Sequence, residues 1–317
     1  MDIKRLRYFT AIAEAGSFSR AAERLHVAQP ALSQHILAME AAFGVKLLQR
    51  NARGVALTEA GQRLLSRARY IDAAFSDLTD FIRGEAVPAG KVRFGMPGTI
   101  NEQLGVPLIE ACRRDYPEVK VRVSEAMSGF VLDWLRDGSI DLAMLYNPED
   151  QKGLSLHHAL TEEIVLFGIK GLKGAPKMST ISLATALQLP LILPGEAHGL
   201  HSLIDMAARS IGKTVKPEIE IDSYRQIKEL ALRGMGFAML PATAVKQEIT
   251  AKIFDVWHVT EPNIDRKICL GYQSHRPISA ASRAVGQLTW NILQRLVLEG
   301  KWAATWNQEE QLLMCGP

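Results

Sequence analysis

Two short helices joined by a tight turn are predicted by residues 17–36, which read SFSRAAERLHVAQPALSQHI. Ser17 is a natural N-cap for the first helix, and the small side chains of Ala21 and Ala22 allow another helix to approach closely. Pro30 suits the first turn of the second helix, where its missing N–H costs nothing. Two helices in this order, the second opening with small polar residues, are typical of the helix-turn-helix arrangement.

The start of the second helix is expected to meet the edges of DNA bases, because a recognition helix enters the major groove by its first turns. Uncharged hydrogen-bonding side chains stand there, and glutamine can pair with adenine through two hydrogen bonds. We therefore predict DNA contacts from Gln29, Pro30, Ser33 and Gln34. Apolar residues spaced by four, three and four positions predict a stripe facing the core, made of Leu32, Ile36, Met39 and Phe43.

Two short strands and a turn are expected after Gly44, over residues 45–50 and 55–57 with residues 51–54 between them. This pair forms a wing beside the helices. Its predicted DNA contacts are Arg50 and Arg53, with Arg53 placed to enter a minor groove or to touch phosphate.

The charge of the chain is divided unevenly along its length. The whole sequence of 317 residues has 37 basic and 34 acidic residues, and its net charge of +3 argues weakly against a nucleic-acid binder. Up to Arg69, however, 11 basic residues face 5 acidic ones, so this part carries +6 and the remainder −3. A basic face is an electrostatic footprint for phosphate, although a solvated face without any ligand is the alternative.

The basic segment resembles the N-terminal winged helix-turn-helix of LysR-type transcriptional regulators over some sixty residues. The resemblance is carried by Phe9, residues 17–22, 29–33 and 44–48, Arg50 and residues 57–61. It implies a DNA-binding role, and an activator that often represses its own gene. Many members have arginine where this chain has Gln34, so the operator sequence is left open.

A long helix is predicted from Thr58 to Gly84, a stretch without proline and with Gly61 as its one internal glycine. Apolar residues recur there every three or four positions, as in a coiled-coil seam. The predicted dimerisation residues are Leu64, Ala68, Ile71, Phe75, Leu78 and Ile82. The family uses this helix for dimerisation, and packing against the chain's own body is the alternative. Residues 87–90, with Pro88 and Gly90, then break the helix.

The rest of the chain alternates predicted strands and helices, which implies a parallel sheet with covered faces. It resembles the effector-binding half of the same regulators, a periplasmic-binding-protein-like pair of α/β lobes, through residues 141–143 and 234–241. The fold class is therefore α/β with an N-terminal, all-α winged helix-turn-helix. The expected parts are a DNA-binding domain (1–58), a linker helix and hinge (59–89) and an effector domain (90–317), with lobe I at about 90–161 and 267–298, lobe II at about 162–266 and a tail at 299–317.

A ligand site is expected beyond the carboxyl ends of the strands, where helix N-termini offer free N–H groups to an anion. The predicted effector contacts are Gly98, Thr99, Ser128, Tyr146, His198, His201, Ser223 and, within one of the family-like motifs, Phe237. Hydroxyl groups at helix starts favour a small carboxylate as the effector, although each hydroxyl can also be an ordinary helix cap.

Signals of enzymes, metals and membranes are weak in this sequence. Residues 212–214 imitate the end of a P-loop without its earlier glycine, and His198 and His201 lack the further ligands of a metal site. We predict no enzyme activity, no cofactor and no bound metal. Three widely spaced cysteines fit a reducing compartment, and the charged N-terminus does not read as a signal peptide, so we expect a cytoplasmic protein without a membrane span.

The sequence thus predicts a ligand-responsive regulator of transcription. Its expected partners are double-stranded DNA, a small effector, further copies of itself as a dimer or a pair of dimers, and RNA polymerase. A solute-binding or transport component using only the two lobes is the alternative, and an α/β enzyme with an N-terminal appendage is a third reading.

Overall fold

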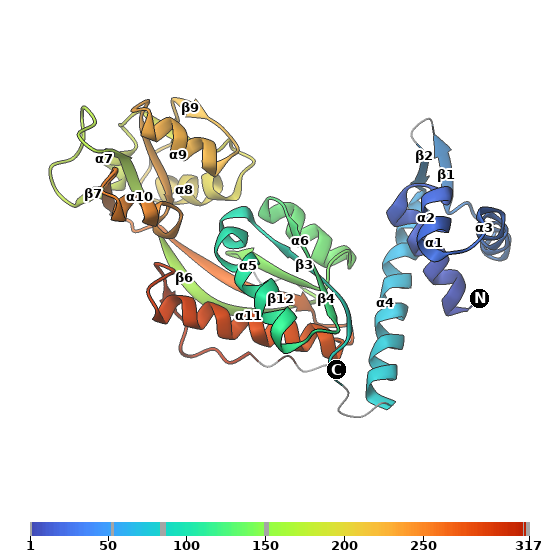
Figure 1. Cartoon of the computed structure of the whole chain (residues 1–317). Helices are drawn as coiled ribbons and strands as arrows, with labels where there is room; N and C mark the ends of the chain where they lie inside the picture. Colours follow the sequence, from blue (N-terminus) through green and yellow to red (C-terminus); the bar gives the residue numbers. More distant parts are fainter. Residues whose placement is uncertain (1, 52–53, 83–86, 149–151, 313, 315–317) are drawn as a thin grey trace.

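The computed structural model describes residues 2–51, 54–82, 87–148, 152–312 and 314, and shows a small helical domain, a long helix and a two-lobed body (Figure 1). The helical domain, called the head below, comprises α1 (Ile3–Ala15), α2 (Phe18–Leu25), α3 (Gln29–Phe43) and the two-stranded wing of β1 (Leu48–Asn51) and β2 (Gly54–Leu57). The fold predicted for the first sixty residues is confirmed.

Local interactions explain where the helices of the head begin and end. The Ser17 hydroxyl accepts a hydrogen bond from the backbone N–H of Arg20, which caps α2 as the sequence predicted. Gly16 ends α1 in the left-handed region, with φ of 60°, and its carbonyl accepts a hydrogen bond from Val55 N in the wing at 3.0 Å. This backbone hydrogen bond therefore connects the end of the first helix to the wing.

A buried carboxylate holds the wing against α3. Glu40 accepts hydrogen bonds from Leu47 N at 2.9 Å and Leu48 N at 3.3 Å, and Lys46 Nζ lies 2.6 Å from its other oxygen. Burial by itself would raise the pKa of Glu40, but these three donors favour the charged form and the pKa is lowered overall. The carboxylate therefore stays ionised and fixes the entry to β1.

The long helix α4 (Glu59–Ile82) follows directly from the wing. The Thr58 hydroxyl accepts a hydrogen bond from Gly61 N at 3.0 Å, as expected for a cap. Gly61 is required at this point because any side chain there would collide with the carbonyl oxygen of Leu47. The turn from wing to helix thus depends on a residue without a Cβ.

The apolar seam predicted for this helix is divided in the structure. Its first two members pack into the core of the head, where Ala68 is fully buried beside the partly buried Leu64. The other four are exposed: Ile71 by 41%, Phe75 by 44%, Leu78 by 52% and Ile82 by 74%. The alternative that the seam packs on its own chain therefore holds for the first turns only.

The first lobe is a sheet of strands covered by helices. Parallel β3 (Gly90–Met96), β4 (Val119–Glu125) and β5 (Leu142–Tyr146) lie beside antiparallel β12 (Asp265–Gln273), which pairs with β6 (Leu154–Ile169). The covering helices are α5 (Gly98–Asp115), α6 (Ser128–Asp137) and α11 (Ala280–Leu298). The sheet is therefore mixed, where the alternation of elements predicted a parallel one, because β12 returns from the other lobe.

The second lobe continues the same sheet on the other half of β6. Its strands are β10 (Phe237–Pro241), β8 (Leu191–Leu193), β9 (Ile219–Glu220), β11 (Phe254–Thr260) and β7 (Thr180–Ser182). Its helices are α7 (Leu183–Ala186), α8 (Gly199–Ser210), α9 (Tyr224–Leu232), the 3-10 turn η1 (Ala242–Val245) and α10 (Lys246–Thr250). Each lobe has its own apolar core, and β6 and β12 run between them (Figure 1).

Several elements differ from the sequence prediction. The strand expected at 164–169 begins at Leu154, because its polar first half pairs with β12 over its full length. The helix expected from Gln103 begins at Gly98. The residues of β7 and β11 were not predicted as strands. β7 has three residues and pairs with β11, and so short a strand carries little pattern of its own.

The tail after α11 crosses back over β6. Its short strand β13 (Thr305–Trp306) pairs with Thr161 and Leu160, and the Trp306 ring lies edge-on against Trp290 at a centroid distance of 5.0 Å. Trp302 is buried, and its Nε1–H donates a hydrogen bond of 3.0 Å to Glu162 Oε2. The tail therefore packs against the strand β6, which runs between the two lobes.

In the part of the chain that is described, no helix is both long and apolar enough to span a bilayer.

We predict that Trp302→Phe destabilises the body by about 1–3 kcal/mol, because it leaves a buried oxygen of Glu162 without its donor. Urea unfolding of the full chain measures the effect. Trp306→Phe is the matched control, since it removes the same atoms from a ring that is only partly buried against Trp290. Equal losses of stability in the two variants would show that the hydrogen bond contributes nothing.

Candidate DNA-binding surface and effector cleft

The first turns of α3 present polar side chains to solvent. Pro30 and Gln34 are exposed, and Gln29 is half-buried, with its Nε2 donating to Ser33 Oγ at 3.2 Å. The opposite face packs inward through the buried residues Leu32, Ile36 and Met39. Phe43, predicted to continue this stripe, is 43% exposed because the helix ends there and leaves the core.

The wing stands next to this helix in the same domain (Figure 1). Its two strands pair in register, with Arg50 opposite Val55 and Asn51 opposite Gly54. Arg53 lies outside the described residues, and Arg50 is described only for its backbone. Their roles in DNA binding therefore stay predictions.

A cavity of about 240 Å³, called the cleft below, lies between the two lobes. It is lined by the ends of β3, β4 and β5 and the N-termini of α5, α6, α8 and α9, the place that the carboxyl-end rule predicts for a ligand. Six of the eight predicted effector contacts line it: Gly98, Thr99, Ser128, Tyr146, His198 and Ser223. Several of them also act as helix caps, as Ser223 does for Gln226 N.

The other two predicted contacts lie away from this cavity. His201 is buried on the inner face of α8, where its Nδ1 lies 2.8 Å from the carbonyl oxygen of Pro194. Phe237 is fully buried in the core of the second lobe, edge-on to Trp257. Phe237 is the first residue of β10 and His201 lies on the inner face of α8, and both side chains point into the core. The prediction that these two residues line the effector site is therefore corrected.

Arg266 is the principal cleft residue that the sequence reasoning missed. It is 4% exposed, and its guanidinium lies 3.7 Å from the centre of the Tyr146 ring and 3.3 Å from Thr99 Oγ1. The Thr99 hydroxyl is also hydrogen-bonded to the Tyr146 hydroxyl. A signal was present, because alternation along β12 puts this charge on the same face of the strand as the apolar Ile268.

A buried carboxylate neutralises this arginine. Glu162, on β6, is 2% exposed, and its Oε1 accepts a hydrogen bond from Arg266 Nε at 2.8 Å. Burial by itself would lower the pKa of Arg266, but the Glu162 charge raises it overall, so the guanidinium stays charged. Burial raises the pKa of Tyr146 to about 12, which keeps its hydroxyl protonated.

Acidic groups also line the cleft. Glu125 ends β4 and accepts a hydrogen bond from Asn101 Nδ2 at 2.6 Å, while Asp222 accepts one from Gly195 N at 2.9 Å. Burial lowers the pKa of His198, whose Nδ1 accepts a hydrogen bond from Leu200 N at the start of α8. The cavity therefore combines hydroxyl groups, one paired guanidinium and two carboxylates.

Two cysteines are buried in the first lobe. Burial raises the pKa of both Cys112 and Cys269 to about 11, so neither thiol ionises near neutral pH. No cluster of histidine, cysteine and acidic side chains in the described ranges has the arrangement of a metal site.

Comparisons with known proteins agree with both halves of the fold. Residues 3–62 match the bacterial regulatory helix-turn-helix protein, lysR family, and residues 85–291 match the LysR substrate binding domain. The chain is 30% identical over 302 residues to the nitrogen assimilation regulatory protein nac of Escherichia coli, an alignment that covers 94% of this chain and 97% of that protein. It is also 30% identical over 295 residues to a probable hydrogen peroxide-inducible genes activator of Mycobacterium leprae, covering 92% and 94%.

The same architecture is present in a solved structure, a full-length OxyR variant from Pseudomonas aeruginosa. The TM-score is 0.78 at 22% identity, with 93% of this chain and 95% of that chain covered. Its fold includes the winged head and the two lobes described above. The chain belongs to the LysR family of DNA-binding transcriptional regulators, with a winged helix-turn-helix joined to a two-lobed effector domain.

Proposed function

We propose that this protein is a transcriptional activator of the cytoplasm that reads DNA with the start of α3 and responds to a small molecule in the cleft. The observation that carries the proposal is the exposed polar first turn of a recognition helix beside a wing, in an N-terminal segment that carries a net charge of +6 up to Arg69. Two curated relatives are named as a regulatory protein and an activator, which supports the same role. An activator also contacts RNA polymerase, and we propose no catalytic role.

We predict that Gln34→Ala weakens binding to the DNA upstream of the protein's own gene by about 5- to 150-fold, the range of one lost bidentate base contact. Binding to unrelated DNA should stay the same, because phosphate contacts supply that affinity. Fluorescence anisotropy at matched salt measures both. Gln188→Ala, an exposed glutamine of the second lobe, is the control. A parallel loss of affinity for both DNAs would rule out base reading by Gln34.

We further propose that the exposed part of the α4 seam forms a dimer. Four apolar side chains of the seam are 41–74% exposed, and burial of such a face against a second copy is favourable at roughly 25 cal/mol per Å². Two heads in one dimer would meet successive major grooves, with half-sites roughly 34 Å apart.

Leu78→Asp is expected to shift the protein towards monomer and to weaken operator binding at least tenfold, because it introduces a charge into the seam. Sedimentation velocity measures the mass of the particle, and fluorescence anisotropy measures its affinity for the operator. Leu298→Asp, at an apolar position that is 76% exposed at the end of α11, is the matched control. A Leu78→Asp protein that sediments like the wild type would contradict the seam.

For the cleft we propose a small carboxylate held by Thr99, Ser128 and Arg266, with the free N–H groups of α6 beside it. Glu125 of the first lobe and Asp222 of the second lobe also line the cleft, and they favour a molecule that also has an amino group. A ligand of this kind touches both lobes. It can therefore shift the equilibrium between two arrangements of the lobes, by no more than the difference in its binding free energy for the two.

We predict that a screen of small carboxylates and amino acids finds a compound that raises the melting temperature of the full chain. Ser128→Ala and Thr99→Val should bind this compound at least fivefold more weakly, since each removes one hydrogen bond. Titration calorimetry measures the affinities, with Ser210→Ala as the control on the far end of α8. Unchanged affinity in both cleft variants would move the effector out of the cleft.

Peroxide sensing is the second function that a relative's name suggests. Two of the three thiols are buried and have pKa values of about 11, which disfavours thiolate chemistry at those positions.

A further inference from the structure

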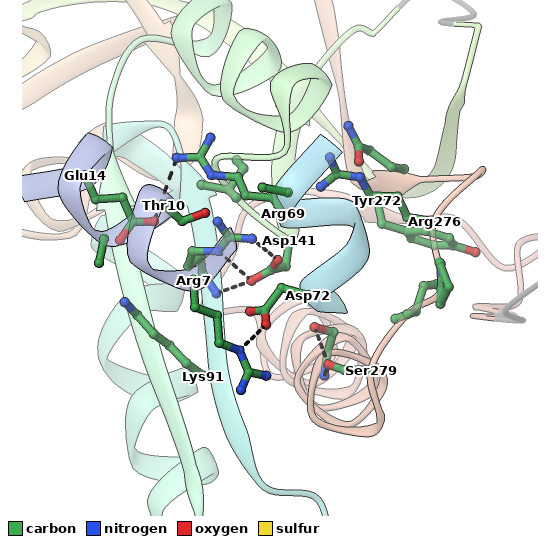
Figure 2. A pocket seen from close by; sticks show the side chains of 18 of the residues that line it. Arg7, Thr10, Glu14, Arg69, Asp72, Lys91, Asp141, Tyr272, Arg276 and Ser279 are labelled. Carbon is green, nitrogen blue, oxygen red and sulfur yellow. Dashed lines mark hydrogen bonds and ion pairs between the residues drawn. The ribbon is translucent and has the colours of Figure 1, made fainter. Parts of the chain in front are cut away.

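A second cavity of about 360 Å³, called the junction cavity, lies where the head meets the first lobe (Figure 2). Side chains converge on it from α1, α2 and α4 on one side and from β3 and the segment after β12 on the other. Its lining shares no residue with that of the cleft. Its volume falls within the range of pockets that hold small molecules.

The lining of the junction cavity is strongly basic. Among the described residues that form it, six are cationic and three are carboxylates. The cationic residues are Arg7, Arg24, Arg69, Lys91, Arg93 and Arg276, and the acids are Glu14, Asp72 and Asp141. Both sides of the junction contribute cations, so their mutual repulsion acts against the contact between head and body.

Half of these cations have a close carboxylate. Arg93 binds Asp141 through two nitrogens, with Nε 3.1 Å from Oδ2. Arg7 Nε lies 2.6 Å from Asp72 Oδ1, and Arg24 lies 3.3 Å from Glu14. These pairs are local, and each is satisfied without any further group.

The other three cations are poorly compensated. Arg276 is 8% exposed and forms no ion pair with any described residue, and its Nη2 donates to the carbonyl of Ser66 at 2.9 Å. Arg69 binds the neutral hydroxyl of Ser139, and its nearest carboxylate oxygens are 3.8 and 3.9 Å away. The side chain of Lys91 forms no ion pair or hydrogen bond with any described residue.

Two of the arginines in the junction cavity have buried polar atoms and lowered pKa values. Nε of Arg69 and Nε of Arg276 are both buried without a hydrogen-bond partner among the described residues. Burial, together with the charge of Arg93, lowers the pKa of Arg276 to about 10 and lowers that of Arg69. Buried charges are normally paired, so an anion in this cavity would be stabilised by the excess of positive charge.

We propose that the junction cavity binds a small anion with two or more negative charges, and that this anion bridges the head, α4 and the first lobe. Three poorly compensated cations around one cavity favour a multivalent anion over a single carboxylate. A polycarboxylate and a phosphorylated compound share this chemistry. Because the anion contacts the head and the body together, it stabilises the docked arrangement of the two and thereby links their geometry to a second signal.

Titration calorimetry of the full-length protein tests this proposal, with citrate and pyrophosphate as the two probes and acetate as a monovalent control, all at one ionic strength. We expect submillimolar binding of at least one multivalent probe and at least tenfold weaker binding of acetate. Binding of citrate alone identifies a polycarboxylate site, and binding of pyrophosphate alone identifies a phosphate site. No binding of either probe overturns the proposal.

Variants separate the junction cavity from general charge effects. Lys91→Gln is expected to weaken the bound probe at least fivefold, and Arg276→Gln more strongly, while Lys216→Gln on the second lobe changes nothing. If Arg276→Gln does not fold, the Lys91→Gln variant tests the proposal by itself, because Lys91 is exposed and its replacement leaves the core unchanged. Equal affinity in Lys91→Gln and Lys216→Gln overturns the proposal. Ser128→Ala should leave probe binding intact, which keeps this result independent of the effector cleft.

Discussion

The buried ion pair of Arg266 and Glu162 lies where β12 and β6 run from one lobe to the other, and the cleft is built around it. Removing two charges from water is expensive, and such a pair is tolerated only when its remaining hydrogen-bonding groups are satisfied. Here Trp302 donates to the carboxylate, and the guanidinium reaches Thr99 and stacks on Tyr146. The pair therefore connects β6, β12 and the tail to Thr99 and Tyr146, which line the cleft.

A second set of contacts holds the head to the body. Arg69 of α4 binds Ser139 beyond α6, and Arg276 binds the carbonyl of Ser66 in α4. Both side chains carry charge that nearby carboxylates offset only in part, whereas the ion pair under the cleft is neutral. The ion pair between the lobes and the basic junction between head and body are thus two places where buried charge joins separate parts of the molecule.

The head was predictable because its signals are local. Ser17 caps α2, Pro30 opens α3, and Thr58 caps α4 through contacts that lie within three residues in the sequence. The rule that ligands bind at the carboxyl ends of parallel strands brought Thr99 and Ser128 to one cavity. Phe237 was predicted from a family-like motif and not from this rule, and it lies in the core of the second lobe, because a motif position does not show which face of a strand looks into the core.

The sequence by itself determined the winged head, the long helix and the alternation of strands and helices, since periodicity and caps act between neighbouring residues. Only the tertiary structure decided which side chains share a cavity: Arg266 meets Glu162 across 104 positions, and Trp302 meets the same carboxylate across 140. It also divided the basic residues of the junction cavity into those with a close carboxylate, such as Arg93, and those without one, such as Arg276. Contacts of this kind depend on how packed elements come together, and no local pattern in the chain records that.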